Sequence, residues 1–306
     1  MPDHNRRSLI RGAFYGALAA VLPPVARAQN SSRLDVTPLG AGTALIRGAG
    51  TNVVAAAVAD GVVLVDGGRA EHAGALLTAV AAAFDGRPVR TLVNTHWHPE
   101  QTGANLAAAR AGARIVSQVN TRLWLGTDIR RPWESFVHRP LPSEALPQVT
   151  FYDSSRETDL GAPIECGHLL QAHTDGDCYV FFPEANVLAC GGVVAGDRWP
   201  LIDWWTGGWL GGLVEGIETL LQVADDETRI VPSHGPIMTR AELEAQRDMY
   251  AELFVRFRDE LLFKGLGPAE AVAARPTADL YPEWQNRDEF VTLAFQGLWG
   301  FYAPDV

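Results

Sequence analysis

The sequence has little cysteine, few basic residues and no long apolar run after its first thirty residues. Three cysteines in 306 residues are too few, and odd in number, for a framework of disulfide bonds. Lys and Arg number 25 against 36 Asp and Glu, which gives a formal net charge of −11. Because nucleic-acid binding depends on a concentrated basic surface, we expect no nucleic-acid partner. The apolar runs fall short of the ~20 residues of a membrane-spanning helix, so no stable membrane insertion is expected.

The chain is long enough and apolar enough to bury a full core. Hydrophobic residues make up 47% of it and charged residues 20%, so most of the chain should be globular rather than disordered. The length allows one large domain or two small ones. No linker and no short-period repeat follows Gln29, and we expect one domain over 29–306 with a helical extension over about 239–306. The sequence does not indicate an oligomeric state.

Residues 1–28 predict an export signal. The pair Arg6-Arg7 precedes an apolar run over 12–22, and Ala26-Arg27-Ala28 offers a small-x-small cleavage site. This order of regions is typical of a twin-arginine signal peptide, with a frayed amphipathic N-terminus as the alternative. The apolar run is too short to remain as a membrane anchor. We therefore expect a periplasmic or secreted protein whose mature chain starts near Gln29.

The first half of the mature chain reads as a β-meander followed by alternating strands and helices. Short β-branched runs between Gly-rich turns predict strands over 43–47, 52–58 and 62–66. Further strands are expected over 90–95 and 114–117, and helices over 71–84, 102–111 and 120–125. Residues 128–148 are rich in Pro and aromatics without periodicity, which predicts a surface loop of functional length.

The second half repeats this order. Strands are expected over 164–172, 178–182, 187–190 and 229–232, and helices over 213–223 and 239–264, with a helical tail through Trp299. If Phe182 pairs with Val187, paired positions sum to 369, so Cys178 and Cys190 lie on opposite faces and should not form a disulfide. Two meanders, each followed by βαβ units, predict an α/β fold in which two sheets pack face to face between helices.

The densest chemistry follows the strand over 90–95, in the run Thr-His-Trp-His-Pro-Glu-Gln over 95–101. His96 and His98, two positions apart on a turn, can aim both imidazoles into one cavity, and neutral imidazole is a good zinc ligand. His173 and His234 also follow predicted strands, where loops assemble sites. A lone His-x-His pair would equally suit a solvated turn. The four histidines together favour a metal site.

In combination, these motifs resemble the metallo-β-lactamase superfamily. That family has an αββα sandwich, a His-x-His-x-Asp-His turn, a later His-Thr-x-Gly, an Asp ending a Leu-x-x-Gly-Asp strand, and a last His in Pro-Gly-His-Gly. Residues 63–68, Val-Leu-Val-Asp-Gly-Gly, match its early aspartate motif, and the resemblance runs from about Val36 to the terminal helices. It implies two mixed sheets between helices, with Asp66 bonding backbone near the metal turn. Residues 174–177, 182–187 and 199–203 are similar to an exported hydrolase group, some of whose members are described as accessory to quinoprotein pathways.

Carried over residue by residue, the resemblance implies one complete zinc site. His96, His98 and His173 supply three imidazoles and leave one position open for water, as in catalytic zinc sites. The second site departs from the pattern: Glu100 stands at the family's Asp, Gln101 at its His and Gly192 at its bridging Asp. His234 alone of that set remains. We expect one zinc, with the second metal weak or missing.

Two further residues are candidates to complete the altered second site. Cys190 lies two positions before Gly192 and shares its strand face, so it could offer a thiolate; the alternative is a small buried core residue, which we favour. Asp197 could fold back into the gap, and the alternative of a solvated loop charge is favoured for it as well.

One zinc is enough for hydrolysis, since three-imidazole zinc lowers the pKa of its bound water from 15.7 to roughly 7. The zinc-bound water would then attack as hydroxide, with Glu100 as general base or, equally, as a group that orients a ligand histidine. Several tryptophans follow these turns and would line an apolar substrate groove or simply pack under the loops. Those assigned to substrate binding are Trp97, Trp204, Trp205 and Trp209, and the polar-flanked, Gly-rich setting of the last three favours a binding lid over a core helix.

Two functions from different classes are consistent with these residues. The first is an exported zinc hydrolase that acts on a small-molecule ester, thioester, lactone or amide. A phosphodiester is less expected, because two metals usually clamp the phosphate, and a β-lactam substrate follows only from fold analogy. The second is a catalytically impaired binding or accessory protein that keeps the fold and at most one metal. Gln101 and Gly192 favour the second function, and the four retained histidines favour the first.

Overall fold

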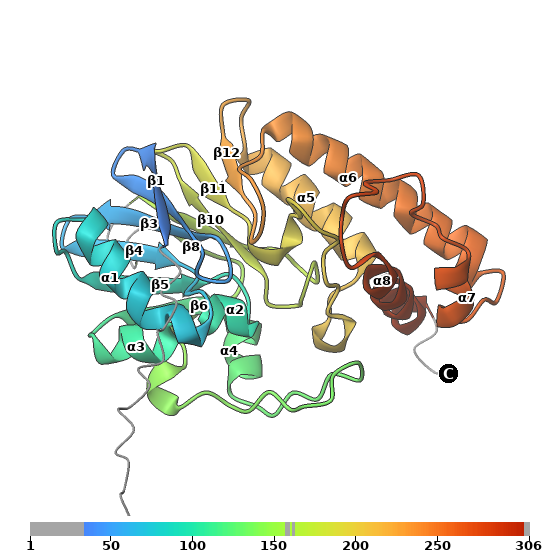
Figure 1. Cartoon of the computed structure of the whole chain (residues 1–306), viewed down its shortest axis with the longest axis horizontal. Helices are drawn as coiled ribbons and strands as arrows, with labels where there is room; N and C mark the ends of the chain where they lie inside the picture. The colour runs from blue at the N-terminus through green and yellow to red at the C-terminus, as the bar shows by residue number, and fades with distance from the viewer. Residues whose placement is uncertain (1–33, 157–159, 161–162, 303–306) are drawn as a thin grey trace, which may run out of the picture. The chain divides into compact units, whose positions relative to one another are not determined.

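A computed structural model describes residues 34–156, 160 and 163–302 (Figure 1). From Leu34 onward the described residues belong to one compact unit. The predicted signal over 1–28 lies outside the described residues. Among the helices that the structure describes, none combines the length and the apolar character needed to cross a bilayer.

The first sheet has seven strands that are neighbours in chain order. The first four form an antiparallel meander, of which β2, β3 and β4 were predicted, and the last four run parallel to one another. The strands are β1 (Asp35–Gly40), β2 (Thr43–Arg47), β3 (Val53–Val58), β4 (Gly61–Val65), β5 (Val89–Asn94), β6 (Arg114–Gln118) and β7 (Val149–Phe151).

The second sheet has five strands in the order β12-β11-β10-β9-β8. They are β8 (Ser154–Arg156), β9 (Glu165–His168), β10 (Cys178–Phe182), β11 (Val187–Ala189) and β12 (Arg229–Val231). Phe182 pairs with Val187 and Val180 with Ala189, which confirms the register that sums to 369. Cys178 packs in the core between the sheets and Cys190 in the core under the helices, so they lie on opposite faces, as predicted.

Alternating side chains explain why the sheets stack between helices. In β4, Val63 and Val65 join the apolar core between the two sheets, whereas Val62 and Leu64 join the core beneath helices, which includes Leu76. A strand that is buried on both faces has a continuous apolar sequence, and every residue of β4 is buried. The expected αββα sandwich of two mixed sheets is therefore present.

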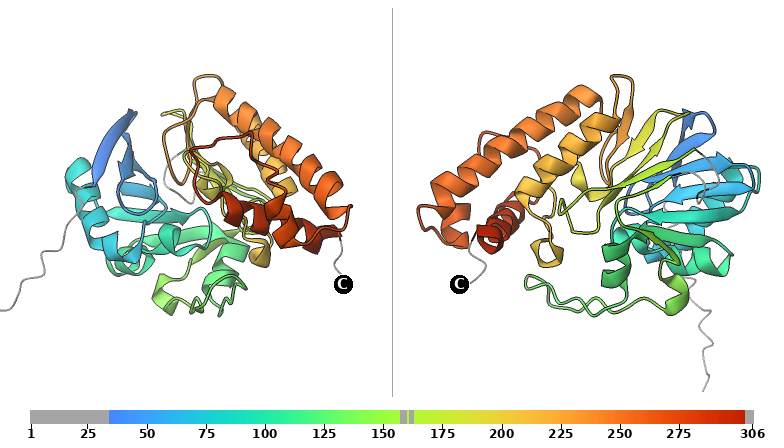
Figure 2. Two further views of the ribbon diagram at one scale, coloured as in Figure 1. Left: turned by 45° about the vertical axis from the view of Figure 1, so that its right-hand side comes forward. Right: turned by 180° about the vertical axis from the view of Figure 1, so that it is seen from behind.

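Helices cover the outer face of each sheet (Figures 1 and 2). Those in the first half are α1 (Ala73–Ala83), α2 (Pro99–Thr102), α3 (Asn105–Arg110) and α4 (Val119–Leu125), with short 3₁₀ turns at η1 (Ala70–His72) and η2 (Ser143–Ala145). Those in the second half are α5 (Leu210–Val223), α6 (Arg240–Val255), α7 (Pro268–Ala273) and α8 (Arg287–Tyr302), with 3₁₀ turns at η4 (Gly191–Val193) and η5 (Trp204–Thr206). Leu188 of β11 packs with Leu213 of α5, Tyr250 of α6 and Phe295 of α8 in one core.

Several element boundaries differ from those predicted. The strand over 164–172 ends at His168, and Gln171 has φ of 50°, so His173 projects from a loop rather than from a strand end. The helix predicted over 102–111 is shortened to α3, and α2 is a separate short helix that ends at Thr102. The helix over 239–264 begins with a capping box between Thr239 and Glu242 and continues past α6 as a π-helical segment, η6 (Arg256–Leu262). The strands β1, β7 and β8 were not predicted.

Candidate metal centre

The turn after β5 carries the paired histidines, and Asp66 at the end of β4 holds it in place. The backbone N–H of Thr95 donates to Oδ1 of Asp66 over 2.8 Å, and Oγ1 of Thr95 lies 2.9 Å from Oδ2. On the other side of the turn, the N–H of Gly67 donates to the carbonyl of Gln101 over 2.6 Å. The structural role expected for Asp66 is confirmed, because it bonds the backbone beside the metal turn.

His173 approaches from the loop between β9 and β10. The carbonyl of His173 accepts a hydrogen bond of 3.1 Å from the N–H of Asp203. The same loop is closed by Asp177, whose Oδ2 accepts 2.6 Å from the N–H of Thr174. The predicted His-Thr-x-Gly-Asp stretch is therefore a compact turn that presents one imidazole.

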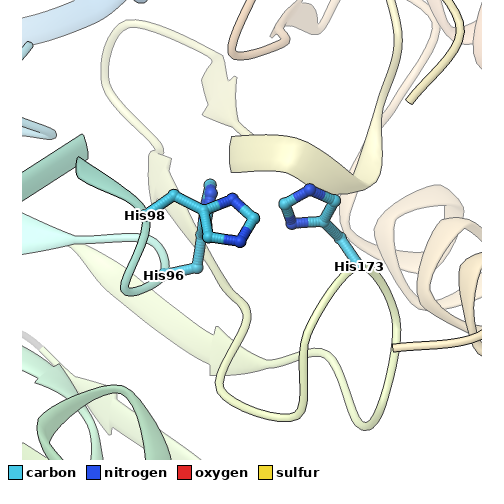
Figure 3. Close-up of side chains that lie close together, drawn as sticks. All are labelled: His96, His98 and His173. Atoms are coloured by element: carbon cyan, nitrogen blue, oxygen red, sulfur yellow. The ribbon is translucent and has the colours of Figure 1, made fainter. Parts of the chain in front are cut away.

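Three imidazoles meet at one point. The ligand atoms of His96, His98 and His173 all lie within 4.8 Å of one another, and all three residues are buried. The ring centroids of His96 lie 4.7 Å from those of both His98 and His173. Figure 3 shows His96 and His98 entering from one strand end and the ring of His173 facing them from the opposite loop.

In His96 and His98, one ring nitrogen points to an oxygen atom, which leaves the other nitrogen for a metal. Nδ1 of His96 lies 3.1 Å from Oγ1 of Thr95, and Nε2 of His98 lies 2.9 Å from Oδ2 of Asp203. Oxygen acceptors of this kind fix the tautomer and orientation of metal-binding histidines. In this arrangement Nε2 of His96 and Nδ1 of His98 carry the free lone pairs.

His173, the third ligand, has a buried ring nitrogen without a hydrogen-bond partner among the described residues. Its Nδ1 lies 3.6 Å from Oδ1 of Asp177. Both atoms are buried and neither has a hydrogen-bond partner among the described residues. Unpartnered buried polar atoms are costly, and a cation bound at the opposite nitrogen of His173 would draw Nδ1–H and the carboxylate together. The three residues therefore fit a divalent metal that prefers imidazole, such as zinc.

Burial sets the charge of the groups around this point. It lowers the pKa of His96 and His98 well below 6.5, and the neighbouring His173 lowers both further. Both rings are thus neutral at pH 7, as metal ligation requires. Burial also raises the pKa of Asp66 to about 8 and raises that of Asp203, although the Arg131 guanidinium opposes the shift at Asp203.

The residues at the altered second metal position do not form a ligand cluster of their own. Among the described residues, the three-histidine group is the one set of potential ligands within reach of a single ion. Gln101 is buried; its Nε2 donates to Oγ of Ser233 over 3.2 Å, and its Oε1 has no partner. Glu100 and His234 are half-buried and line the same cavity of about 190 Å³ as the histidines.

Gly192 stands at the position where the resemblance implies a bridging Asp, and the space for a side chain there is occupied. A Cβ atom at this position would lie 2.6 Å from Nδ1 and Cε1 of the His173 ring. The ring of His173 thus fills the space where a side chain at position 192 would begin.

Neither compensating ligand considered from the sequence joins the cluster. Cys190 is fully buried in the core beneath the helices, and burial raises the pKa of its thiol, so it is a core residue. Asp197 is exposed and pairs with Arg198 over 2.9 Å, as expected of a loop charge.

The tryptophans separate into two groups. Trp97 is buried, and its Nε1 donates to Oγ1 of Thr206 over 3.1 Å. Trp204, Trp205 and Trp209 do not line the metal-site cavity. The C-terminal helix α8 packs against two of them instead: Nε1 of Trp204 donates to Gln296, and Trp209 stacks on Phe301 with centroids 3.9 Å apart. Trp205 is 44% exposed. Trp204 and Trp209 therefore pack against α8 rather than form the expected lid over the metal site.

Two residues of the site were missed in the sequence. Asp203 is fully buried beneath His98, and Arg131 from the 128–148 loop reaches the same carboxylate, with Nη1 3.3 Å from Oδ2. Arg131 also pairs with Glu134. The sequence analysis used residues 199–203 only for the resemblance to an exported hydrolase group. No spacing in the sequence connects Asp203 to His98.

Comparisons with known proteins agree with this geometry. A family model described as the metallo-beta-lactamase superfamily matches residues 46–234. A metallo-beta-lactamase from Pontibacter korlensis is 22% identical, with a TM-score of 0.58 over 71% of this chain and 99% of that chain. The DIM-1 metallo-beta-lactamase is 16% identical, with a TM-score of 0.57 over 72% of this chain and 97% of its own. Curated protein sequences give no match. Because the family model spans more than half of the 306 residues, the chain belongs to the metallo-beta-lactamase superfamily.

Proposed function

We propose that this protein is a zinc hydrolase with one metal, which cleaves an ester, thioester, lactone or amide. The observation that carries the proposal is the convergence of His96, His98 and His173 on one point, with one nitrogen of His96 and one of His98 directed at an oxygen atom. Three imidazoles with a fourth position open are the ligand set of catalytic rather than structural zinc. When bound there, zinc would supply a water of lowered pKa and polarise a carbonyl oxygen.

The residues around the histidines suit the remaining tasks of a hydrolase. The carboxylate of Glu100 lines the cavity beside the ligand set and would accept the proton of the attacking water. Asp203 and Thr95 hold His98 and His96 in the tautomers that leave a lone pair toward the cavity. The neutral amide of Gln101 adds no charge that would attract a second cation.

The second candidate function is a binding or accessory protein without turnover. It is favoured by Gln101 and Gly192, which remove two ligands that the superfamily uses for its second metal. Both functions share the single metal site, so metal binding alone does not separate them.

The deciding experiment combines metal content with chelator-sensitive turnover. We expect protein purified without added zinc to contain about one zinc per chain by elemental analysis. We also expect it to hydrolyse members of a panel of esters, thioesters, lactones and amides, with loss of turnover on chelation and recovery on adding zinc. One zinc per chain with no chelator-sensitive turnover on the whole panel would favour the binding protein.

A pair of variants tests the ligand assignment. His98→Ala should abolish zinc binding, because it removes one of three ligands. Gln101→Ala should change the zinc content little, because Gln101 lies outside the ligand cluster. Equal losses in both variants would make Gln101 a metal ligand and contradict the single-metal assignment.

We further propose that the protein acts in the periplasm or outside the cell, after twin-arginine export directed by residues 1–28. The support is the order of the Arg6-Arg7 pair, the short apolar run and the small-x-small site. Replacing Arg6 and Arg7 with lysine should leave the precursor in the cytoplasm, as measured by fractionation and immunoblotting. Unchanged export of this variant would contradict the proposal.

A further inference from the structure

A second, larger cavity adjoins the one that holds the three histidines. It has a volume of about 620 Å³ against about 190 Å³ for the metal-site cavity. Arg69 and Glu100 line both cavities, so the two adjoin at these residues. A ligand in the larger cavity therefore lies beside residues that also border the metal site.

The walls of the larger cavity are mainly apolar and come from separate parts of the chain. The metal turn, α3, α4 and the 128–148 loop each contribute, and the apolar side chains that matter most are Trp97, Leu106, Trp124, Ile129, Phe136 and Leu141. Phe136 is 57% exposed. A large aromatic side chain left in water at the edge of an apolar hollow marks a ligand site more often than a scattered surface residue does.

The outer wall is held in place without a ligand. Ile129 and His138 exchange two backbone hydrogen bonds of 3.0 Å, and the N–H of Leu141 donates to the carbonyl of Leu125 over 2.9 Å. Arg131, at the base of the same loop, is anchored to Glu134 and Asp203. A groove whose walls are fixed before binding loses less conformational entropy when a ligand enters.

Arg69 places a positive charge where the two cavities meet. Its side chain is exposed, and no hydrogen bond or ion pair of its guanidinium is found within the described residues. Gly50, with φ of 101°, makes room for it, because a Cβ at that position would lie 2.6 Å from Cγ of Arg69. By contrast, Arg139 on the same groove is paired with Asp128 over 2.7 Å. Arg69 is thus available to a carboxylate.

We propose that the cavity lined by Leu106, Ile129 and Phe136 binds the apolar acyl or aryl arm of a carboxylate-bearing substrate, with Arg69 contacting the carboxylate. This inference rests on the proposed function, and it specifies the substrate class: an anionic ester, thioester, lactone or amide with an apolar arm. The groove takes the place that the sequence had assigned to Trp204, Trp205 and Trp209.

Binding of sodium decanoate to the zinc-loaded protein tests the groove without any turnover. Decanoate combines an apolar chain with a carboxylate, and isothermal titration calorimetry reports its affinity. We expect Leu106→Gln to weaken binding at least tenfold and Leu123→Gln to leave it unchanged. Leu123 is 60% exposed on α4 and lies outside the groove, so it is a matched control. If Leu106→Gln does not fold, Phe136→Ser replaces it as the groove variant, because Phe136 is at an exposed position, and it should weaken decanoate binding in the same way.

The carboxylate contact has its own variant. Arg69→Gln should weaken decanoate binding while leaving the affinity for decanol unchanged, because decanol lacks the charge. Equal effects on the two ligands would remove Arg69 from the proposal. If Leu106→Gln and Phe136→Ser both bind decanoate as tightly as the wild type, the proposal that this groove binds the apolar arm is wrong.

Turnover separates this inference from the proposed function. On p-nitrophenyl esters from acetate to decanoate, we expect kcat/KM to rise by up to about fourfold per methylene buried, and the rise to vanish in the groove variants. Chelator-sensitive hydrolysis with no dependence on chain length would overturn the groove and leave the hydrolase standing. If the groove variants lose decanoate binding but the wild-type protein hydrolyses no ester, the proposed groove is supported and the proposed hydrolase function is contradicted.

Discussion

The Nε2 atom of His98 lies 2.9 Å from Oδ2 of Asp203, a carboxylate 105 positions further along the chain. Nη1 of Arg131 lies 3.1 Å from the same nitrogen and 3.3 Å from the same oxygen. A guanidinium can only donate and an ionised carboxylate can only accept, so Asp203 is satisfied when Nε2 of His98 carries the proton. The approach of Nη1 to Nε2 is then a contact, and Nη1 donates to Oδ2 of Asp203. Nδ1 of His98 is then left with its lone pair, and Asp203 determines which tautomer faces the metal.

Replacing Asp203 with asparagine should therefore weaken zinc binding by about 10-fold to 100-fold. The amide keeps the size of the side chain and one acceptor, but loses the charge that holds the proton on Nε2. Competition with a chromophoric chelator measures the affinity. Asp259→Asn removes the same charge from an exposed site paired with Arg258 and should have no effect. Equal affinities for the wild type and Asp203→Asn would show that the carboxylate does not position His98.

Arg131 should be far more important for stability than Arg139 of the same loop. The side chain of Arg131 is 6% exposed and that of its partner Asp203 is 0% exposed, whereas the Arg139 and Asp128 pair is 69% and 42% exposed. Arg131→Met leaves a buried carboxylate without its cation and should lower the free energy of unfolding by roughly 3–5 kcal/mol. Arg139→Met should cost less than about 1 kcal/mol. Urea denaturation compares the two, and similar losses would contradict the buried role.

Restoring the family's carboxylate at position 192 should damage the first metal site rather than rebuild the second. A Cβ atom at Gly192 would lie 2.6 Å from Nδ1 of His173, so the ring must move. We expect both Gly192→Ala and Gly192→Asp to lose most of their zinc in elemental analysis. Gly74→Ala, where a Cβ meets nothing within 4 Å, is the control and should retain it. Two zinc ions per chain in Gly192→Asp would contradict this expectation.

Much of this fold could be predicted from the sequence because its signals are local. The unbroken apolar run from Val62 to Val65 predicts a strand, and a short hairpin turn sets the pairing of Phe182 with Val187. His96 and His98 are neighbours on one turn, so their joint role is visible in their spacing. His173 was a candidate because it follows a predicted strand, and the resemblance assigned it to the first metal site, since nothing local connects it to the other two.

The parts that escaped prediction depend on contacts between distant segments. Asp203 acquires its role only when its loop folds beneath His98, and Arg131 lies in a loop without periodicity. Trp209 looked like a binding residue because its Gly-rich surroundings suit a lid, yet its stacking on Phe301 depends on how the last helix returns to the body of the protein. Packing of this kind is set by tertiary structure, which local patterns do not encode.

The buried carboxyl of Asp66 should make stability depend on pH in a specific direction. Its pKa in the folded protein is about 8, against an ordinary value of 3.8. Between these values the unfolded chain has released the proton and the folded chain retains it, so this group's contribution to stability falls as pH rises from about 4 to 8. Asn cannot titrate, tolerates the positive φ of 66° at this position, and keeps an acceptor for Thr95.

Urea denaturation of chelator-treated protein at pH 5, 6.5 and 8 measures this dependence. The free energy of unfolding of the wild type, relative to that of Asp66→Asn, should be highest at pH 5 and lowest at pH 8. Asp60→Asn, at a side chain that is 69% exposed, should show no such trend. A wild-type advantage that grows with pH would mean that the folded protein holds Asp66 ionised, because Thr95 and the metal turn then stabilise the carboxylate more than burial opposes it.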